Sequence, residues 1–274
     1  MKGQQCDKAA PALKLVASEG PLLIAHRGCC TLAPENTLPS FRLALEAGAD
    51  LVELDYRHSK DGVPVVIHDR YLDRTTDVRD RWRRKRVRVD RTLAADIESL
   101  DAGRWFHAKF AGTQIPLLRE ALEFIQAKRG VALIEHKAGD AQTCAGLLRS
   151  LHLVNHVVVI SFDWAFLREF HRLEPAQMLG ALGPPTHLAD GRRWSGLRRS
   201  FGPAWLKKLR KTGARIAVWN SRISGAAVRQ AHEAGVKVWV YTVDDLARAR
   251  RLIRMGADGI ITNRISSLAP SLRA

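Results

Sequence analysis

Charged side chains follow or interrupt two apolar, strand-like runs near the start of this 274-residue sequence. The run "LLIA" leads directly into His26 and Arg27, and the run "LVELD" carries Glu53 and Asp55 two positions apart. Because successive strand residues face opposite sides, both carboxylates are predicted to share one face. Two carboxylates that close are costly to bury unless a cation lies between them. The spacing therefore indicates a cation site.

Glu135, in the apolar run "VALIEHK", supplies a third carboxylate at the end of a later strand-like run. Three oxygen ligands without cysteine suit a hard divalent cation, Mg²⁺ or Ca²⁺. The alternative is a solvated acidic rim whose charges are paired with Arg27 and Lys137.

Two histidines occupy similar strand-end positions. His26 ends the first run, and His68 ends "VPVVIHD", where Asp69 follows it directly. Two imidazoles beside a bound phosphate could serve as general base and general acid near neutral pH. The alternative is a structural role for each histidine.

The elements that would position these residues follow a parallel α/β pattern, in which short apolar runs alternate with helical segments. One pair breaks the pattern, because only His58 to Val63 separate two of the runs and a parallel crossover needs a dozen residues or more. These two runs are predicted to form an antiparallel hairpin. The predicted strands are 22–27, 51–57, 64–68, 131–137, 156–162, 177–182, 214–220, 236–242 and 257–262.

Without the hairpin arm, eight βα units remain. They predict a (β/α)8 TIM barrel in a single domain, 1–274, with residues 58–115 inserted between strand 2 and its helix. In such barrels the chemistry gathers at the carboxyl ends of the strands. The charged residues and histidines singled out above lie at those ends.

Composition indicates the cellular compartment of the protein and the charge of its partners. The chain has no long apolar segment, no signal-like N-terminus and no CxxC pair among its four cysteines, so a cytoplasmic protein is expected. The net charge of +16 favours an anionic partner. Residues 79–91 are especially basic. If that run is extended, both of its faces are positive, and at least one must meet water or an anion, such as a phosphate-bearing substrate or an anionic membrane surface.

Several motifs resemble the glycerophosphodiester phosphodiesterase family, in the family's order and over most of the chain: "AHRG" (25–28), "PENT" (34–37), "KDGVPVVIHD" (60–69), "LDRTTD" (72–77), "IEHK" (134–137) and "ADGIITN" (257–263). The resemblance implies a TIM barrel with an insertion after strand two and a divalent metal. It places the metal on Glu53, Asp55 and Glu135. His26 and His68 match the acid and base positions, and Arg27 and Lys137 match residues that hold phosphate.

The resemblance also extends to positions at the edge of the site. Glu35 and Asn36 of "PENT" border the site, where Glu35 could position His26 or the metal shell; the alternative is a loop and N-cap motif. The chain departs from the family's usual "WTVN" with Tyr241-Thr242-Val243-Asp244, preceded by Trp239. Trp239 and Tyr241 are expected to contact substrate. Because this departure falls where the organic group of the substrate would bind, no particular alcohol is predicted. A second departure is Asn263, where the family usually has Asp.

The expected reaction is hydrolysis of a glycerophosphodiester to sn-glycerol 3-phosphate and an alcohol. The attacking hydroxyl comes from water or from the glycerol 2-OH. A lysophospholipid or sphingolipid phosphodiesterase on the same barrel is the nearest alternative, suggested by four aromatic residues of the insertion: Trp82, Trp105, Phe106 and Phe110. A nucleic-acid binder is not expected, because it would leave the carboxylates and histidines unexplained.

Overall fold

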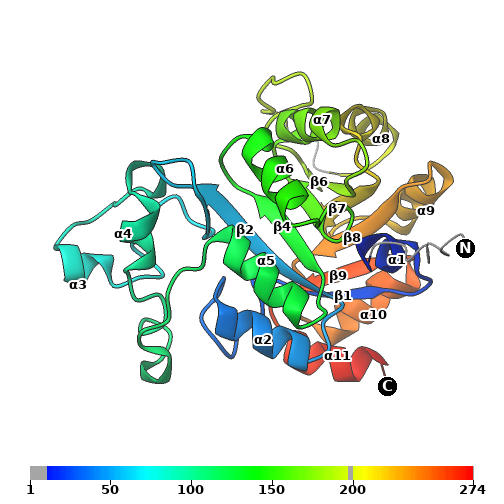
Figure 1. Ribbon diagram of the computed structural model, residues 1–274. Coiled ribbons are helices and arrows are strands. Elements are labelled where there is room, and N and C mark those ends of the chain that lie inside the picture. The colour runs from blue at the N-terminus through cyan, green and yellow to red at the C-terminus, as the bar shows by residue number, and fades with distance from the viewer. Residues whose placement is uncertain (1–10, 197–199, 274) are drawn as a thin grey trace, which may run out of the picture.

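A closed barrel of eight parallel strands forms the centre of the computed structural model, which describes residues 11–196 and 200–273 (Figure 1). Strand β1 pairs with both β2 and β9, and these two pairings close the ring. The strands are β1 (Leu22–Ala25), β2 (Leu51–His58), β3 (Pro64–Val66), β4 (Ala132–His136), β5 (Val158–Ser161), β6 (Leu179–Gly183), β7 (Ile216–Asn220), β8 (Lys237–Tyr241) and β9 (Gly259–Thr262). The predicted (β/α)8 fold is confirmed.

Strand β3 is the one strand in the described residues that lies outside the ring. It pairs antiparallel with the end of β2, with Tyr56 opposite Val66. This is the predicted hairpin, and it begins the insertion that separates β2 from its helix.

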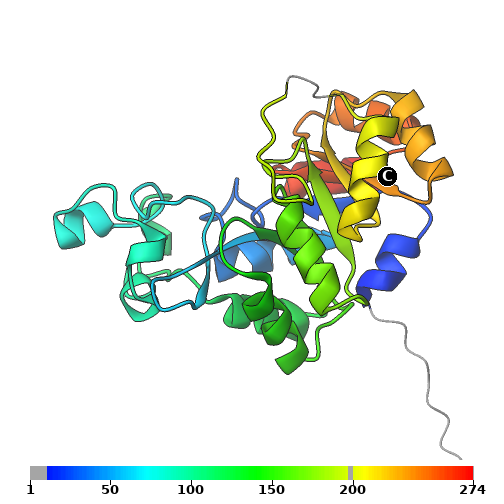
Figure 2. The same cartoon turned by 90° about the horizontal axis from the view of Figure 1, so that it is seen from above.

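Helices surround the barrel, as Figures 1 and 2 show from two directions. Helix α10 illustrates the sequence signals: the Asp245 side chain accepts a hydrogen bond from the Arg248 N–H (2.7 Å), and Gly256 follows the helix with a φ of +97°. None of the described helices has the length and apolar character needed to cross a bilayer. The helices are α1 (Pro11–Ala17), α2 (Leu38–Glu46), α3 (Val78–Trp82), α4 (Ala94–Glu98), α5 (Leu118–Ala127), α6 (Ala141–Ser150), α7 (Trp164–Leu173), α8 (Pro203–Leu209), α9 (Gly225–Glu233), α10 (Leu246–Arg254) and α11 (Ile265–Arg273), with short 3₁₀ helices at Val89–Arg91, Ala108–Phe110 and Arg210–Thr212.

The barrel strands bury both of their faces, which explains their continuous apolar runs. In β2, Val52 and Leu54 pack outward into the core shared with the helices. A separate cluster fills the barrel interior, and Ala12 and Val16 of α1 belong to it together with residues at the amino ends of the strands. Helix α1 therefore closes the end of the barrel opposite the predicted site.

The inserted segment between β2 and α5 projects from one side of the barrel in both views (Figures 1 and 2). It contains β3, α3, α4 and two of the 3₁₀ helices. It has its own hydrophobic cluster, which includes Ile67, Leu72 and Ile97. The insertion is thus a packed unit, and β3 carries His68 from this unit towards the barrel.

Candidate active site

The turn after β1 presents the Arg27 backbone to the site. Arg27 and Gly28 both have left-handed backbone conformations, with φ of +56° and +78°. A Cβ at Gly28 would lie 2.3 Å from the Ser40 hydroxyl oxygen, so glycine is required there. This turn directs the Arg27 N–H to the Glu53 carboxylate, at 2.6 Å.

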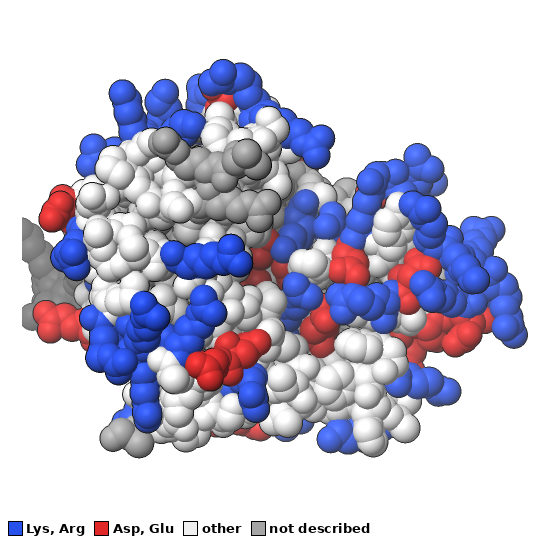
Figure 3. Space-filling model, turned by 180° about the vertical axis from the view of Figure 1, so that it is seen from behind, with Lys and Arg blue, Asp and Glu red and all other residues white. Residues whose placement is uncertain are grey.

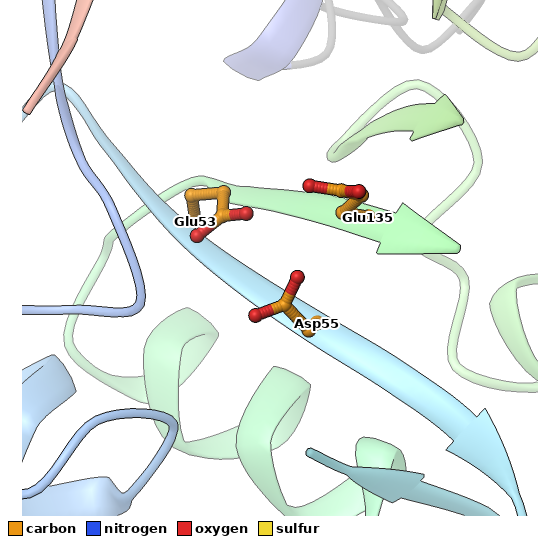
Figure 4. Close-up of side chains that lie close together, drawn as sticks. All are labelled: Glu53, Asp55 and Glu135. Atoms are coloured by element: carbon orange, nitrogen blue, oxygen red, sulfur yellow. The ribbon is translucent and has the colours of Figure 1, made fainter. Parts of the chain in front are cut away.

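Three buried carboxylates converge on one space. Glu53 and Asp55 come from β2 and Glu135 from β4, and their side chains point towards one another (Figure 4). One oxygen of each lies within 4.8 Å of the others. Asp55 pairs with Glu135 across the two strands, so the register of the sheet brings the carboxylates together.

Two cations flank this carboxylate cluster. Lys137 Nζ lies 3.1 Å from Asp55 Oδ1 and forms an ion pair with Glu135 Oε1, and Arg27 Nε lies 3.3 Å from Asp55 Oδ2. Asp55 Oδ1 and Glu135 Oε1 are both buried, and Lys137 Nζ is the cation beside these two oxygens. Three buried carboxylates that face one space are the donor set that Mg²⁺ or Ca²⁺ prefers, so these residues fit a divalent cation.

The metal-free carboxylates differ in charge. Burial raises the pKa of Glu53 to about 8, with the Asp55 charge adding to the effect, and burial likewise raises the pKa of Glu135 to about 8. Burial also acts to raise the pKa of Asp55, but the positive charges of Lys137 and Arg27 outweigh it and lower the pKa to about 2. Asp55 is therefore the carboxylate that the two cations hold ionised.

We expect Glu53→Gln to stabilise the metal-free protein at pH 8. The unfolded chain loses the Glu53 proton near pH 4.3 and the folded protein near pH 8, so the fold binds more protons in this interval and loses stability as the pH rises through it. A neutral amide at position 53 has no proton to lose, so the variant avoids the free-energy cost of ionising a buried carboxyl group. With a chelator present, the melting temperature should rise by roughly a few degrees at pH 8 and change little at pH 4.5.

The matched control is Glu123→Gln, an exposed residue of α5, which should leave the melting temperature unchanged at both pH values. A Glu53→Gln protein that melts below wild type at pH 8 would mean that Glu53 is ionised and stabilising in the metal-free fold.

Asn36 orients Asp55, and Glu35 joins two arginines. The Asn36 amide donates to Asp55 Oδ2 (2.8 Å) and accepts from the Asp55 N–H (3.0 Å). The N-cap of α2 is Thr37, so Asn36 borders the site without being the cap. Glu35 accepts hydrogen bonds from Arg27 (2.9 Å) and from Arg74 (2.7 and 2.8 Å), so it acts on the site through Arg27, a contact that the sequence did not suggest.

The His26 ring is held by a residue that sequence reasoning had noted only as a departure. His26 Nδ1 lies 2.6 Å from Asn263 Oδ1. The Asn263 amide nitrogen donates to Asp244 Oδ2 at 2.7 Å, which fixes the amide so that its oxygen faces His26. An amide oxygen only accepts, so Nδ1 of His26 carries the proton and Nε2 is left with a free electron pair.

The His68 ring is held by a carboxylate. His68 Nδ1 lies 2.7 Å from Asp69 Oδ1, and Arg74 Nε donates to the other Asp69 oxygen at 2.6 Å. The Arg57 side chain donates to the His68 backbone oxygen (2.8 Å), which ties the hairpin arm to β2. Arg74, Asp69 and Arg57 were not predicted as site residues, because only the folded hairpin brings them to the mouth.

Burial lowers the pKa of both imidazoles. For His26 the neighbouring Arg27 charge adds to the lowering, while for His68 the Asp55 charge opposes it. Both rings are consequently biased towards the neutral form in the metal-free protein.

The two aromatic residues of β8 differ in their surroundings. Trp239 is fully buried in the barrel interior against Gly259, where an added Cβ would lie 2.6 Å from the indole. The structure gives Trp239 a packing role in place of the predicted substrate contact. Tyr241 donates to the Gly183 carbonyl (2.8 Å) and lines a cavity of about 420 Å³ at the carboxyl ends of β6 to β8, so its contact with substrate stays a prediction.

The aromatic residues of the insertion do not line that cavity. Trp105 packs on Phe106, and Phe106 on Phe110, with ring centroids 5.7 Å apart in each pair. Trp82 packs against the hydrophobic cluster of the insertion. These contacts favour packing over the lipid-gripping surface that the lysophospholipid alternative requires.

Comparisons of sequence and of structure found similar known proteins. The model of the glycerophosphoryl diester phosphodiesterase family matches residues 26–267. A glycerophosphodiester phosphodiesterase of Caldanaerobacter subterraneus is 33% identical over 248 residues, covering 88% of this chain and 93% of that protein. The crystal structure of a glycerophosphodiester phosphodiesterase from Agrobacterium tumefaciens is 29% identical, with a TM-score of 0.75, covering 91% of this chain and 99% of that one.

A second solved structure contains a product. It is an Oleispira antarctica phosphodiesterase in complex with sn-glycerol 3-phosphate, 28% identical, with a TM-score of 0.78, covering 93% of this chain and 97% of that chain. The family match spans strands β2 to β9 and the three carboxylates of the cluster. The chain therefore belongs to the glycerophosphoryl diester phosphodiesterase family.

Proposed function

We propose that this protein hydrolyses glycerophosphodiesters to sn-glycerol 3-phosphate and an alcohol. The observation that carries the proposal is the cluster of Glu53, Asp55 and Glu135 at the barrel mouth, with a histidine at the end of β1 and another on the hairpin arm. The product bound to the Oleispira relative agrees with sn-glycerol 3-phosphate as one product.

Arg27 and Lys137 are the residues that would bind the phosphate. Both cations lie against the carboxylate cluster, so an anion bound there contacts them and the cation site together. A divalent cation held by the three carboxylates would neutralise charge on a phosphoryl oxygen. Asn36 keeps Asp55 oriented, and Glu35 keeps Arg27 in place.

The two histidines have partners suited to different tasks. Burial favours the neutral form of His26, and the Asn263 amide oxygen accepts from Nδ1–H, so Nε2 has a free electron pair; this suits the general base that takes a proton from the attacking hydroxyl. The Asp69 carboxylate stabilises a protonated His68, which suits the general acid that protonates the departing alcohol. This division holds whether water or the glycerol 2-OH attacks; in the second case a cyclic phosphate forms first, and its hydrolysis exchanges the two roles.

Metal depletion followed by restoration tests the proposal. The chelated protein should release no sn-glycerol 3-phosphate from glycerophosphocholine, glycerophosphoethanolamine or glycerophosphoglycerol. Adding back Mg²⁺ or Ca²⁺ separately should restore release and identify the cation. Unchanged release after depletion would contradict the metal site, and turnover of lysophosphatidylcholine alone would contradict the substrate class.

A further inference from the structure

A positively charged groove of about 670 Å³ lies in the inserted segment and shares no residue with the carboxylate site. Seven of its thirteen lining residues are Lys or Arg, and one is acidic. We call it the basic groove; it is lined by Lys60, Arg81, Trp82, Arg84, Lys85, Arg86, Val87, Arg88, Arg91, Thr92, Leu93, Asp96 and Ser99. Figure 3 shows Lys and Arg side chains gathered over the insertion.

The backbone of the basic run turns instead of extending, contrary to the arrangement considered from sequence. Helix α3 ends at Trp82, and Arg83 and Arg86 then take left-handed conformations with φ of +55° and +56°. The Asp73 carboxylate accepts hydrogen bonds from the backbone N–H groups of Arg86 (2.7 Å) and Val87 (3.0 Å). Asp73 also pairs with Arg79 (3.2 Å), which does not line the groove, so this acid holds the backbone of the run and neutralises only its first arginine.

Part of the positive charge in the groove has no counter-charge. Arg88 pairs with Asp90, and the Arg86 guanidinium lies over the Tyr71 ring, 5.5 Å from its centroid. The side chains of four exposed lining cations form no ion pair, hydrogen bond or ring contact with any described residue: Lys60, Arg84, Lys85 and Arg91. Like charges gathered this closely repel one another, and a bound anionic partner would relieve that repulsion.

An exposed apolar side chain accompanies these cations. Leu93 lines the same groove and is 44% exposed, among the most exposed large apolar residues of the described chain. A bilayer surface accommodates both kinds of group, because anionic headgroups meet the cations and the acyl region below them accepts the leucine. The phosphates of a nucleic acid attract the cations but offer nothing to Leu93.

We propose that the basic groove docks the protein on anionic lipid bilayers. This role is independent of the catalytic proposal, because the groove and the carboxylate site share no residue. Docking would hold the enzyme at a membrane surface without any spanning segment.

The test is co-sedimentation with vesicles made of phosphatidylcholine and phosphatidylglycerol in equal parts, compared with phosphatidylcholine alone. Wild type should bind the mixed vesicles and not the neutral ones. Each Lys or Arg near an anionic surface contributes about fivefold to affinity. The triple variant Arg84→Gln, Lys85→Gln, Arg91→Gln should therefore bind roughly 100-fold more weakly.

A charge-matched control distinguishes binding through the basic groove from attraction caused by the overall charge of +16. Arg229→Gln, Arg251→Gln and Arg254→Gln remove the same charge from exposed positions on α9 and α10, on the other side of the barrel from the insertion (Figures 1 and 2). This control should retain most of its binding. Equal losses in the two triple variants, at unchanged melting temperatures, would overturn the proposal.

Leu93→Ser distinguishes a bilayer from other polyanions. Leu93→Ser should weaken binding to the mixed vesicles about tenfold. This loss of affinity should remain at high salt, where electrostatic attraction is screened. The comparison uses a single-stranded oligonucleotide as the probe. If the oligonucleotide binds as tightly as the vesicles and Leu93→Ser changes neither, the groove binds nucleic acid and the lipid proposal is wrong.

Discussion

Asp55→Asn is expected to abolish turnover of glycerophosphodiesters while leaving the fold intact. Asp55 faces Lys137 and Arg27, and its pKa is lowered to about 2, so it supplies full negative charge to the cation site at neutral pH. A neutral amide removes that charge and leaves the two basic residues unbalanced. We expect kcat/KM to fall more than about 100-fold, because the ligand acts on the transition-state charge through the metal.

The measurement is release of sn-glycerol 3-phosphate over a range of metal concentrations, together with circular dichroism and thermal melting. Saturating metal should not restore the rate. Glu123→Gln, exposed on α5, is the control and should retain wild-type activity. Retention of more than about a tenth of wild-type activity by Asp55→Asn would contradict the assignment.

Removal of either histidine should cost on the order of 10²-fold to 10⁴-fold in kcat, but with different substrate dependence. If His68 is the acid, a substrate with a p-nitrophenolate leaving group needs no proton and should partly rescue His68→Ala. His26→Ala should lose the same factor on both substrates, since the attacking hydroxyl still needs a base. Wild-type kcat/KM should be bell-shaped in pH, and because burial lowers the pKa of His26 in the free enzyme, the acid limb should lie at lower pH than for an exposed imidazole.

The control for this pair is Asn263→Ala, which keeps the imidazole of His26 but removes the amide that orients it, together with that amide's hydrogen bond to Asp244. It should lower the rate less than His26→Ala does and share that variant's indifference to the leaving group. Rescue of His26→Ala by the activated substrate, with none for His68→Ala, would reverse the proposed roles.

The sequence predicted the parts of this molecule that depend on local pattern. Apolar runs located all nine strands, and the short interval from His58 to Val63 correctly required a hairpin. The two-residue alternation along β2 placed Glu53 and Asp55 on one face, and the β2–β4 register then brought Glu135 to them.

The sequence did not predict how deeply a residue is buried or which residues far apart in the chain contact each other. Trp239 was expected to contact substrate, but it is completely buried, because Gly259 on the next strand has no side chain and leaves room for the indole. The link from Asp244 through Asn263 to His26 joins the ends of three different strands, so no local spacing reveals it. The apolar pattern of helix α1 is too short to predict from the sequence that this helix closes the barrel.

The closure of the barrel between β1 and β9 also bears on the order in which the chain can fold during synthesis. His26 and its partner Asn263 are 237 positions apart in the sequence. Contacts of such long range form slowly and require nearly the whole polypeptide to have left the ribosome. The inserted segment, whose hydrophobic cluster is complete by Ile115, can fold much earlier. A chain that stops before Gly259 would contain all three carboxylates and both histidines, yet β1 would lack β9, the neighbour that closes the ring, and His26 would lack its partner Asn263.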